Sequence, residues 1–268
     1  MKTNKSKVKV SNLFSALTMI ICLVIGFSLW KFVMGDPSNF EGGNVESGTP
    51  QNVLGMVYHG GYIVPVLMGL LLMTLVFSIE RFFVLNRSEG KGNLSKFVQN
   101  VQRKITEGKM AEAKQMCDKQ KGSVANVIHS ALVKYDEVVA EGFDSEKASE
   151  MIGTEIEEAT SLEMPTLEKN MVILSTMVSL GTLFGLLGTV TGMIKAFRGL
   201  ATAGAPDQVQ LAAGISEALI NTATGIGTSI LATIAYNFFT SKIDTLTYFV
   251  DEAGSVLTNA YRKLKGQK

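Results

Sequence analysis

Glu217 and two threonines, Thr189 and Thr222, lie in runs of apolar residues long enough to cross a membrane. A carboxylate within a bilayer costs about 2.5 to 3.5 kcal/mol on insertion scales, so Glu217 needs a wet cavity, a hydrogen-bond partner or its neutral form. Hydrocarbon offers the threonine hydroxyls no partner either. Together the three residues favour a polar conduit, and by themselves they leave open what crosses it.

The same residues also fit a purely structural role. Glu217 could form a fixed bond to a threonine or an arginine of another helix and never titrate. A threonine in a membrane helix commonly donates to its own backbone. Thr189 and Thr222 therefore support a conduit only as a layer with Glu217.

Helical geometry places the three residues at similar depths. Counting about 1.5 Å per residue from the outer turn, Thr189 lies roughly 12 Å down its helix and Thr222 roughly 15 Å down the next, with Glu217 about one turn above Thr222. The two helices are antiparallel, so we expect one polar layer in the outer half of the bilayer. The predicted pathway also includes Ser175, Thr182 and Ser229, and a polar line of Glu217, Asn221, Thr224 and Thr228 runs along the second helix.

Glycines follow one face of the first of these helices. Gly181, Gly185, Gly188 and Gly192 are spaced four, three and four residues apart, which places them on one side of a helix and lets a neighbouring backbone approach closely. Gly225 belongs to a matching pattern of small residues on the second helix, with Ala218, Thr222 and Ser229. We interpret these glycines as helix-packing residues.

The elements that must position these residues are four apolar runs. The chain has 268 residues, 46% hydrophobic composition, a mean hydropathy of +0.23 and a net charge of +1. Each run provides the roughly 20 residues needed to span about 30 Å of hydrocarbon. This composition excludes a nucleic-acid binder and a typical soluble enzyme, and it predicts an all-α, polytopic membrane protein with four transmembrane helices and long cytoplasmic helical extensions.

The positive-inside rule sets the orientation, because the N-terminal leader is rich in lysine. Three basic residues disagree with this orientation because they lie toward the outer face, namely Lys31, Lys195 and Arg198. They are few compared with the basic residues on the predicted inner side. The predicted segments are a basic cytoplasmic leader at 1–11, an uncleaved extra helix at 12–34, a periplasmic loop at 35–59, a transmembrane helix at 60–85, a cytoplasmic helical domain at 86–170, pore-lining helices at 171–197 and 210–240 joined by a periplasmic loop at 198–209, and a cytoplasmic C-terminal helix at 241–268. Both termini are then cytoplasmic.

The segments outside the membrane differ in expected structure. The outer loop contains Asp36, Glu41, Glu46 and several glycines, so we expect little structure of its own. In the inner region, amphipathic helices are predicted at 94–106, 110–119 and 124–139, separated by glycines. Asp144 is placed to cap a further helix that runs into the third apolar run, with a bend at Pro165.

Other candidates for chemistry are weak. His59 and His129 are isolated, and Cys22 and Cys117 have neither a metal-binding spacing nor a disulfide context. The sequence has no nucleotide-binding loop and no nucleophile–base pair, so we predict no catalytic residue, no metal and no cofactor. One intramembrane carboxylate is too few for a complete proton relay, and a partner protein could supply another.

The two motif-bearing stretches resemble the MotA/TolQ/ExbB proton-channel family, with ExbB the nearest branch. The resemblance rests on Gly185-Leu-Leu-Gly-Thr-Val-Thr-Gly-Met193, Gly214-Ile-Ser-Glu-Ala-Leu-Ile-Asn-Thr-Ala-Thr-Gly-Ile226 and Tyr236-Asn237, and it covers the region from Ser175 to Asn237. By motif position, Thr189 and Thr222 correspond to the family's pore-facing threonines and Glu217 to its intramembrane glutamate.

The resemblance implies partners and a location. It implies a homo-oligomer, a pentamer, in the bacterial inner membrane, whose last two helices surround an ExbD-like single-span protein with an intramembrane aspartate. Proton flow would then move that partner and deliver work to a TonB-like protein, for TonB-dependent outer-membrane transport. Membrane lipid is the surrounding contact, and no nucleic acid is expected.

The chain departs from the family pattern in two ways. Thr182 and Leu231 stand where family members often carry proline, and the fourth, N-terminal helix gives the layout of MotA. A TolQ-like envelope-maintenance motor and a flagellar or gliding stator therefore stay open. From other classes, a structural membrane scaffold stays open, whereas a secondary transporter would show two similar halves, which are not seen.

Overall fold

The computed structural model describes residues 2–45, 48–202 and 208–266, which form helices joined by short connections. Four of these helical segments are long and apolar enough to cross a membrane: Ser15–Met34, Gly61–Ser88, Met171–Gly199 and a stretch within Gln208–Lys263. The prediction of an all-α polytopic membrane protein with four spanning helices is therefore confirmed. The chain divides into two compact units, at 1–79 with 170–236 and at 80–169 with 237–268.

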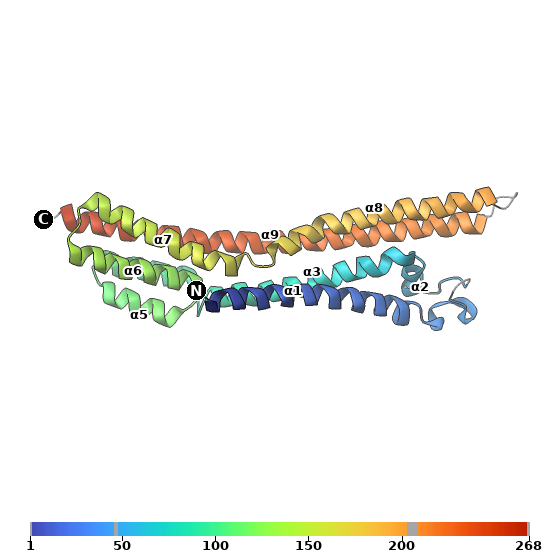
Figure 1. The fold of residues 1–268 in the computed structure, drawn as a ribbon, viewed down its shortest axis with the longest axis horizontal. Helices are drawn as coiled ribbons and strands as arrows, with labels where there is room; N and C mark the ends of the chain where they lie inside the picture. The colour runs from blue at the N-terminus through green and yellow to red at the C-terminus, as the bar shows by residue number, and fades with distance from the viewer. Residues whose placement is uncertain (1, 46–47, 203–207, 267–268) are drawn as a thin grey trace. The chain divides into compact units, whose positions relative to one another are not determined.

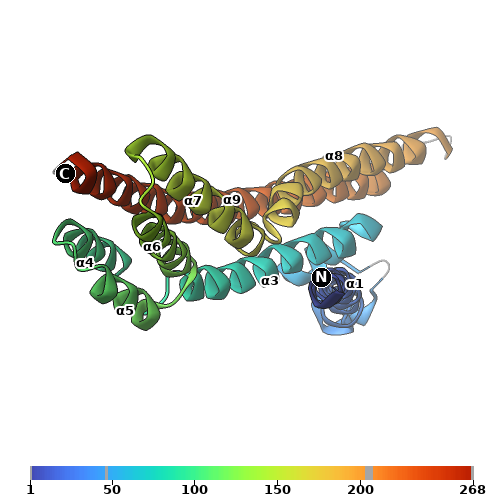
Figure 2. The same ribbon diagram turned by 60° about the vertical axis from the view of Figure 1, so that its left-hand side comes forward.

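The first unit contains the apolar helices. Helix α1 covers Lys2–Ser28 and continues as a π-helical turn at Leu29–Met34, α3 covers Val64–Ser88, and α8 covers Met171–Thr202. Helix α9, Gln208–Gly266, contributes its first part to this unit and its second part to the other, and the end of α3 from Glu80 onward also belongs to the other unit. Figures 1 and 2 show α8 and α9 side by side.

The extra N-terminal helix contacts α3 through glycine. A Cβ atom at Gly26 would lie 2.7 Å from the backbone nitrogen of Gly69 and 2.9 Å from the carbonyl oxygen of Pro65. Nearer the start of α1, the Ser15 hydroxyl donates to Oδ1 of Asn170 at 3.0 Å. Helix α1 is thus held against the rest of the unit by close backbone packing and by a polar contact.

The outer segment, which lies between α1 and α3, is folded, and the expectation of little structure was wrong. It contains 3₁₀ turns at Pro37–Asn39, Glu41–Gly43 and Gly61–Ile63, helix α2 at Val53–Tyr58, and a bridge between Phe40 and Pro50. Buried Asn39 donates to the carbonyls of Val33 and Met34. These contacts join residues five, six and ten positions apart, and local composition does not reveal them. Glu46 lies outside the described residues.

Aromatic rings complete this outer segment. The Trp30 ring stacks on Tyr58 with centroids 4.8 Å apart, and its indole nitrogen donates to the Tyr58 carbonyl at 3.3 Å. Phe40 is buried and packs edge-on against Tyr58 and flat against His59. His59 therefore has a packing role in this cluster.

The second unit is a helical bundle. It contains α4 at Leu94–Thr106, α5 at Met110–Gln120, α6 at Ser123–Glu141 and α7 at Ser145–Leu167, close to the predicted amphipathic helices. Gly92, Gly108 and Gly122, the predicted separators, all have positive φ, which glycine adopts at little cost. The Asp144 carboxylate accepts from the backbone nitrogens of Glu146 and Lys147, as an N-cap does.

The prediction that α7 continues without a break into the third apolar helix was wrong, because the helix is interrupted between the two. Helix α7 ends at Leu167, and Asn170 adopts a φ of +62° just before α8 begins. Arg81, which is 1% exposed, donates to the carbonyls of Thr166 and Leu167 at 3.2 and 3.3 Å. The buried Arg81 guanidinium thus provides hydrogen-bond donors for two of the last carbonyls of α7. A helix can end at little cost in free energy where its terminal carbonyls have such partners.

The second part of α9 contributes to the core of the second unit. Leu246, Val250 and Leu257 are buried, and the Tyr261 hydroxyl donates to the carbonyl of Phe143 at 3.0 Å. The predicted helices at 210–240 and 241–268 are therefore one continuous helix as far as Gly266.

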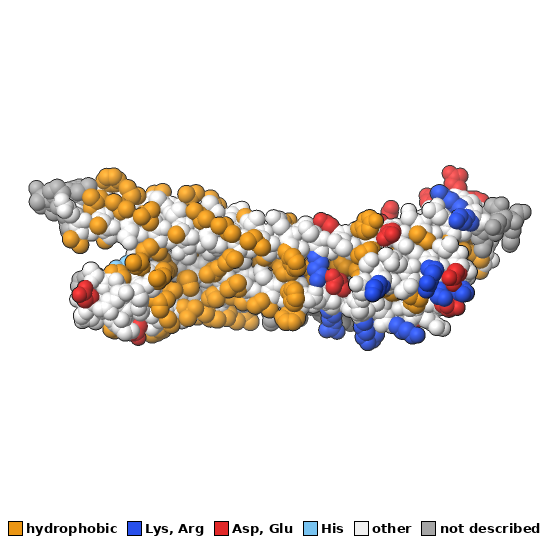
Figure 3. All heavy atoms as spheres, turned by 180° about the vertical axis from the view of Figure 1, so that it is seen from behind, with side chains coloured by type: hydrophobic (Ala, Val, Ile, Leu, Met, Phe, Trp, Pro, Cys, Tyr) orange, Lys and Arg blue, Asp and Glu red, His pale blue; other side chains and the backbone are white. Residues whose placement is uncertain are grey.

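The surfaces of the two units differ in composition. On the face shown in Figure 3, hydrophobic side chains spread over the unit that contains the apolar helices, whereas Lys, Arg, Asp and Glu gather over the other unit. Large exposed apolar residues of the first unit include Phe32, Val190, Ile194 and Ile234 from its spanning helices and their ends. Lipid is the environment in which such a surface is stable.

Candidate functional site in the α8–α9 pair

The small residues of α8 and α9 meet in antiparallel order. Gly181 lies against Ser229, Gly185 against Gly225, Gly188 against Asn221, and Gly192 against Ala218 and Gly214. As the α8 numbers rise, the α9 numbers fall. The structure therefore brings all five predicted packing glycines into one helix–helix interface.

This interface leaves no room for side chains at the glycines. A Cβ atom at Gly181 would lie 2.6 Å from the Ser229 hydroxyl and 2.9 Å from the Gly225 carbonyl. A Cβ atom at Gly185 would lie 3.2 Å from the Cα atom of Gly225, and one at Gly188 would overlap the Asn221 side chain. Backbones at this distance fix the depth at which the polar side chains of the two helices face each other.

Thr189 and Thr222 are brought into direct contact. Their hydroxyls form a hydrogen bond across the interface, and either one can be the donor. The Thr189 hydroxyl also lies 3.3 Å from the Gly185 carbonyl, and that of Thr222 lies 2.9 Å from the Ala218 carbonyl. The pair is half-buried, so its hydroxyls form a polar contact near the surface of the helix pair.

The remaining predicted hydroxyls divide into two groups. The Thr182 hydroxyl donates to that of Ser229 at 2.9 Å, which makes a second cross-helix pair about two helical turns nearer the start of α8. Ser175 is not brought to this line, because its hydroxyl donates to the Val172 carbonyl of its own helix. Thr224 and Thr228 likewise donate to backbone carbonyls of α9.

Glu217 pairs with a lysine and not with the threonines. Its Oε1 atom accepts from Nζ of Lys195 at 2.6 Å, and its side chain is 11% exposed while that of Lys195 is 52% exposed. The sequence predicts Glu217 in a layer with Thr189 and Thr222 and indicates no role for Lys195 beyond orientation. The antiparallel order of the small residues is the signal that could have placed Lys195 near Glu217.

Asn221 is a second residue whose place in the site was missed. It is completely buried, and its side-chain nitrogen donates to the Gly60 carbonyl, 161 residues away in sequence, at 2.8 Å. Its Oδ1 atom is buried and has no hydrogen-bond partner among the described residues. Helical periodicity predicts Asn221 on the polar line of α9 but does not indicate a partner for it.

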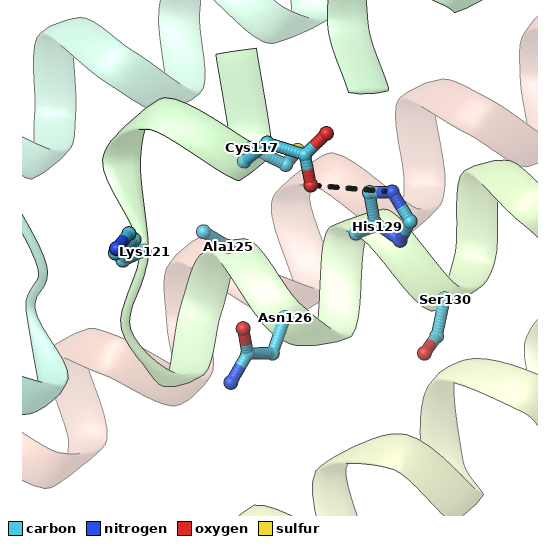
Figure 4. A pocket seen from close by; sticks show the side chains of 7 residues that line it. Cys117, Lys121, Ala125, Asn126, His129 and Ser130 are labelled. Atoms are coloured by element: carbon cyan, nitrogen blue, oxygen red, sulfur yellow. Dashed lines mark ion pairs between the residues drawn. The ribbon is translucent and has the colours of Figure 1, made fainter. Parts of the chain in front are cut away.

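The second unit contains a separate cleft. It has a volume of about 370 Å³ and lies between α5 and α6, with Cys117, Lys121 and Asn126 in its wall (Figure 4). Nε2 of His129 lies 3.6 Å from an Asp118 oxygen; the Asp118 side chain is exposed and His129 is half-buried. Burial raises the pKa of the Cys117 thiol to about 12, which leaves it unreactive near neutrality. Among the described residues, no three His, Cys, Asp or Glu side chains are grouped to hold a metal ion.

Comparison with known proteins identifies relatives of parts of this chain. The Tol-Pal system protein TolQ of Pseudomonas aeruginosa is 38% identical over 120 residues, which is 43% of this chain and 52% of TolQ. The biopolymer transport protein ExbB of Pseudomonas putida is 28% identical over 134 residues, 50% of this chain and 40% of that protein. The chain thus spans about half the length of these two relatives.

A third relative covers more of the chain. The putative biopolymer transport protein ExbB-like 3 of Synechocystis sp. is 25% identical over 211 residues, which is 78% of this chain and 94% of that protein. A family model described as the MotA/TolQ/ExbB proton channel family matches residues 119–252, which include α8 and the spanning part of α9. The chain belongs to the MotA/TolQ/ExbB proton channel family.

Proposed function

We propose that this chain is the ExbB-like channel subunit of an inner-membrane motor that uses the proton gradient to energise TonB-dependent outer-membrane transport. The observation that carries the proposal is the contact between Thr189 and Thr222 across the α8–α9 interface, within the family-matched region. Hydroxyls can both donate and accept, so a threonine pair can pass hydrogen bonds to water or to a carboxylate of a partner.

The proposed assembly is a ring of these subunits, a pentamer, around an ExbD-like partner. The partner is a single-span protein whose intramembrane aspartate carries the proton, because Glu217, the carboxylate that this chain places near the pathway, is paired with Lys195. Thr189, Thr222, Thr182 and Ser229 line the pathway, whereas Ser175 forms a bond within its own helix. The orientation follows the positive-inside rule, with both termini in the cytoplasm.

The experiment is proton flux through the chain co-reconstituted with its partner. Replacing Thr189 or Thr222 with valine keeps the shape and removes the hydroxyl, and we expect flux to fall about tenfold, the equivalent of one lost hydrogen bond of about 1.4 kcal/mol. Serine at either position keeps the hydroxyl and retains more flux. Thr176→Val is the matched control, because Thr176 lies on α8 and donates only within its own helix among the described contacts. Unchanged flux in both valine variants would remove the pair from the mechanism.

A TolQ-like role is the second candidate, and the identity to the P. aeruginosa TolQ favours it specifically. A flagellar or gliding stator and a membrane scaffold remain as further candidates. Co-purification from native membranes separates these roles. A small aspartate-bearing partner together with a TonB-like protein supports the ExbB-like role, Tol-type partners support the TolQ-like role, and a stable assembly without any such partner supports the scaffold.

A further inference from the structure

The turn that precedes α3 lies directly on the α8–α9 pair. A Cβ atom at Gly61 would lie 2.5 Å from Oε1 of Glu217 and 3.4 Å from Nζ of Lys195, and Gly61 has a φ of +78°. The neighbouring Gly60 accepts the hydrogen bond from Asn221. Two consecutive backbone positions of one turn are therefore in contact with three side chains of the α8–α9 pair.

The charges in this contact compensate each other. The Lys195 ammonium lies 2.6 Å from the Glu217 carboxylate, and the carboxylate is the more buried partner. A buried carboxylate without a cation is unfavourable, and losing one member of such a pair costs more than losing both. Lys195 is half-exposed, so the lysine can keep contact with water while it neutralises Glu217.

Asn221 adds a polar contact that has no charge. Its side-chain nitrogen is committed to the Gly60 carbonyl at 2.8 Å, and the residue is completely buried. A hydrogen bond to a backbone carbonyl in an apolar region fixes the position of that carbonyl, since no water competes for it. The Gly60–Gly61 turn is thus held by one hydrogen bond and by close packing against one ion pair.

We propose that Lys195, Glu217 and Asn221 form an outer latch that fastens the Gly60–Gly61 turn before α3 to the α8–α9 pair. Within it, Glu217 is a positioning residue, the fixed counter-ion of Lys195, and does not carry the transported proton. This second statement rests on the proposed channel function, whereas the latch itself does not. The latch holds the neighbouring parts of α8 and α9 in register, so the Thr189–Thr222 contact keeps its geometry.

The first test is a charge cycle at the pair. Lys195→Met leaves the carboxylate unpaired, so we expect the purified assembly to unfold about 2–4 °C lower. Lys195→Arg keeps the positive charge, so we expect this variant to retain the thermal unfolding midpoint of the wild type. We expect two double variants to recover part of the unfolding midpoint and part of the proton flux. The first combines Lys195→Met with Glu217→Gln, and the second exchanges the two charges by combining Lys195→Glu with Glu217→Lys. Lys31→Met is the control, because Lys31 is also a lysine near the end of a spanning helix, but its cation lies over the Phe32 ring and not beside Glu217.

The second test is a pair of glycine variants. Gly61→Ala places a methyl group against the Glu217 carboxylate and also strains a positive φ. Gly42→Ala has the same kind of strain, with a φ of +69°, but nothing lies within 4 Å of its Cβ position. We expect Gly61→Ala to lower the midpoint more than Gly42→Ala does.

The outcomes separate the latch from the channel. If Lys195→Met and the double variant unfold like the wild type, and the two glycine variants are equal, the latch is overturned. If the charge-exchanged variant recovers stability but no flux, the latch stands and Glu217 takes part in proton transfer, which overturns the positioning role. If the wild-type assembly conducts no protons with any partner, the proposed function fails while the stability cycle still decides the latch.

Discussion

At the residue scale, each hydroxyl of the Thr189–Thr222 contact has two possible partners. Each lies near the facing hydroxyl and also near a carbonyl of its own helix, at Gly185 for Thr189 and at Ala218 for Thr222. When the cross-helix bond breaks, neither hydroxyl is left without a partner in hydrocarbon. The contact can therefore open toward water or toward a partner carboxylate at a small cost in free energy.

The chemistry of the Cys117 thiol is a prediction at this scale. Cys117 is buried, and desolvation raises its pKa to about 12, with the nearby Asp118 adding to the shift. Because the thiolate is the reactive species and forms only as the pH approaches that value, we expect very slow alkylation by iodoacetamide at pH 8 in the folded protein. The measurement is mass spectrometry of a Cys22→Ser variant before and after denaturation. Equal modification rates in the two states would contradict the burial of this thiol.

Some of these residues can be predicted from the sequence and others cannot, for a physical reason. The spacing of Gly181 to Gly192 and the depth of Thr189 and Thr222 follow from helical periodicity, which local sequence contains. The partner of Glu217 depends on the register between two helices, and the partner of Asn221 lies 161 residues away. Register and distant contacts require the packed structure.

At the scale of the element, the packing of α8 against α9 depends on the close approach of their backbones. Gly225 lies where a methyl group would overlap the Gly181 carbonyl and would approach the Cα atom of Gly185 to 2.7 Å, whereas Gly227, two residues on, has nothing within 4 Å of its Cβ position. Both are glycines in the interior of α9, so alanine favours the helix equally at each.

These two glycines form a matched pair for mutation. We expect Gly225→Ala to separate the helices and to lower stability by about 1–3 kcal/mol, as overpacking does. Gly227→Ala is expected to be neutral or to raise stability by up to about 1 kcal/mol. Thermal unfolding in detergent measures both. A loss at Gly227 as large as that at Gly225 would place another subunit against that face of α9.

Helices that depend on local sequence signals can be predicted, whereas features that depend on long-range contacts cannot. Helices α4 to α7 were foreseen because amphipathic periodicity and the separating glycines are local, and the Asp144 cap was foreseen for the same reason. The end of α7 was not foreseen, because the buried Arg81 that binds its last carbonyls comes from α3, 85 residues earlier in sequence. The outer segment was not foreseen, because Asn39 and the aromatic rings stabilise it through contacts that composition does not reveal.

At the scale of the whole molecule, four spanning helices require both ends of the chain to lie on one side of the membrane. The prediction concerns cysteines placed in a Cys22→Ser, Cys117→Ser background. Glu41→Cys, in the outer segment, reacts with a membrane-impermeant maleimide in spheroplasts, whereas Gln99→Cys, on the exposed face of α4, reacts only after the membrane is opened. The reverse pattern would invert the orientation, and labelling of both in intact spheroplasts would contradict the separation of these two segments by a membrane span.

The outer segment has one consequence for optical spectroscopy. Trp30 is the single tryptophan of the chain, it is 8% exposed, and it stacks on Tyr58 at 4.8 Å. Excitation near the red edge of protein absorption therefore selects one indole, at the junction of α1 with the outer segment. Its emission maximum and its quenching will respond to events at that junction, while the unit formed by α4 to α7 contributes no tryptophan signal.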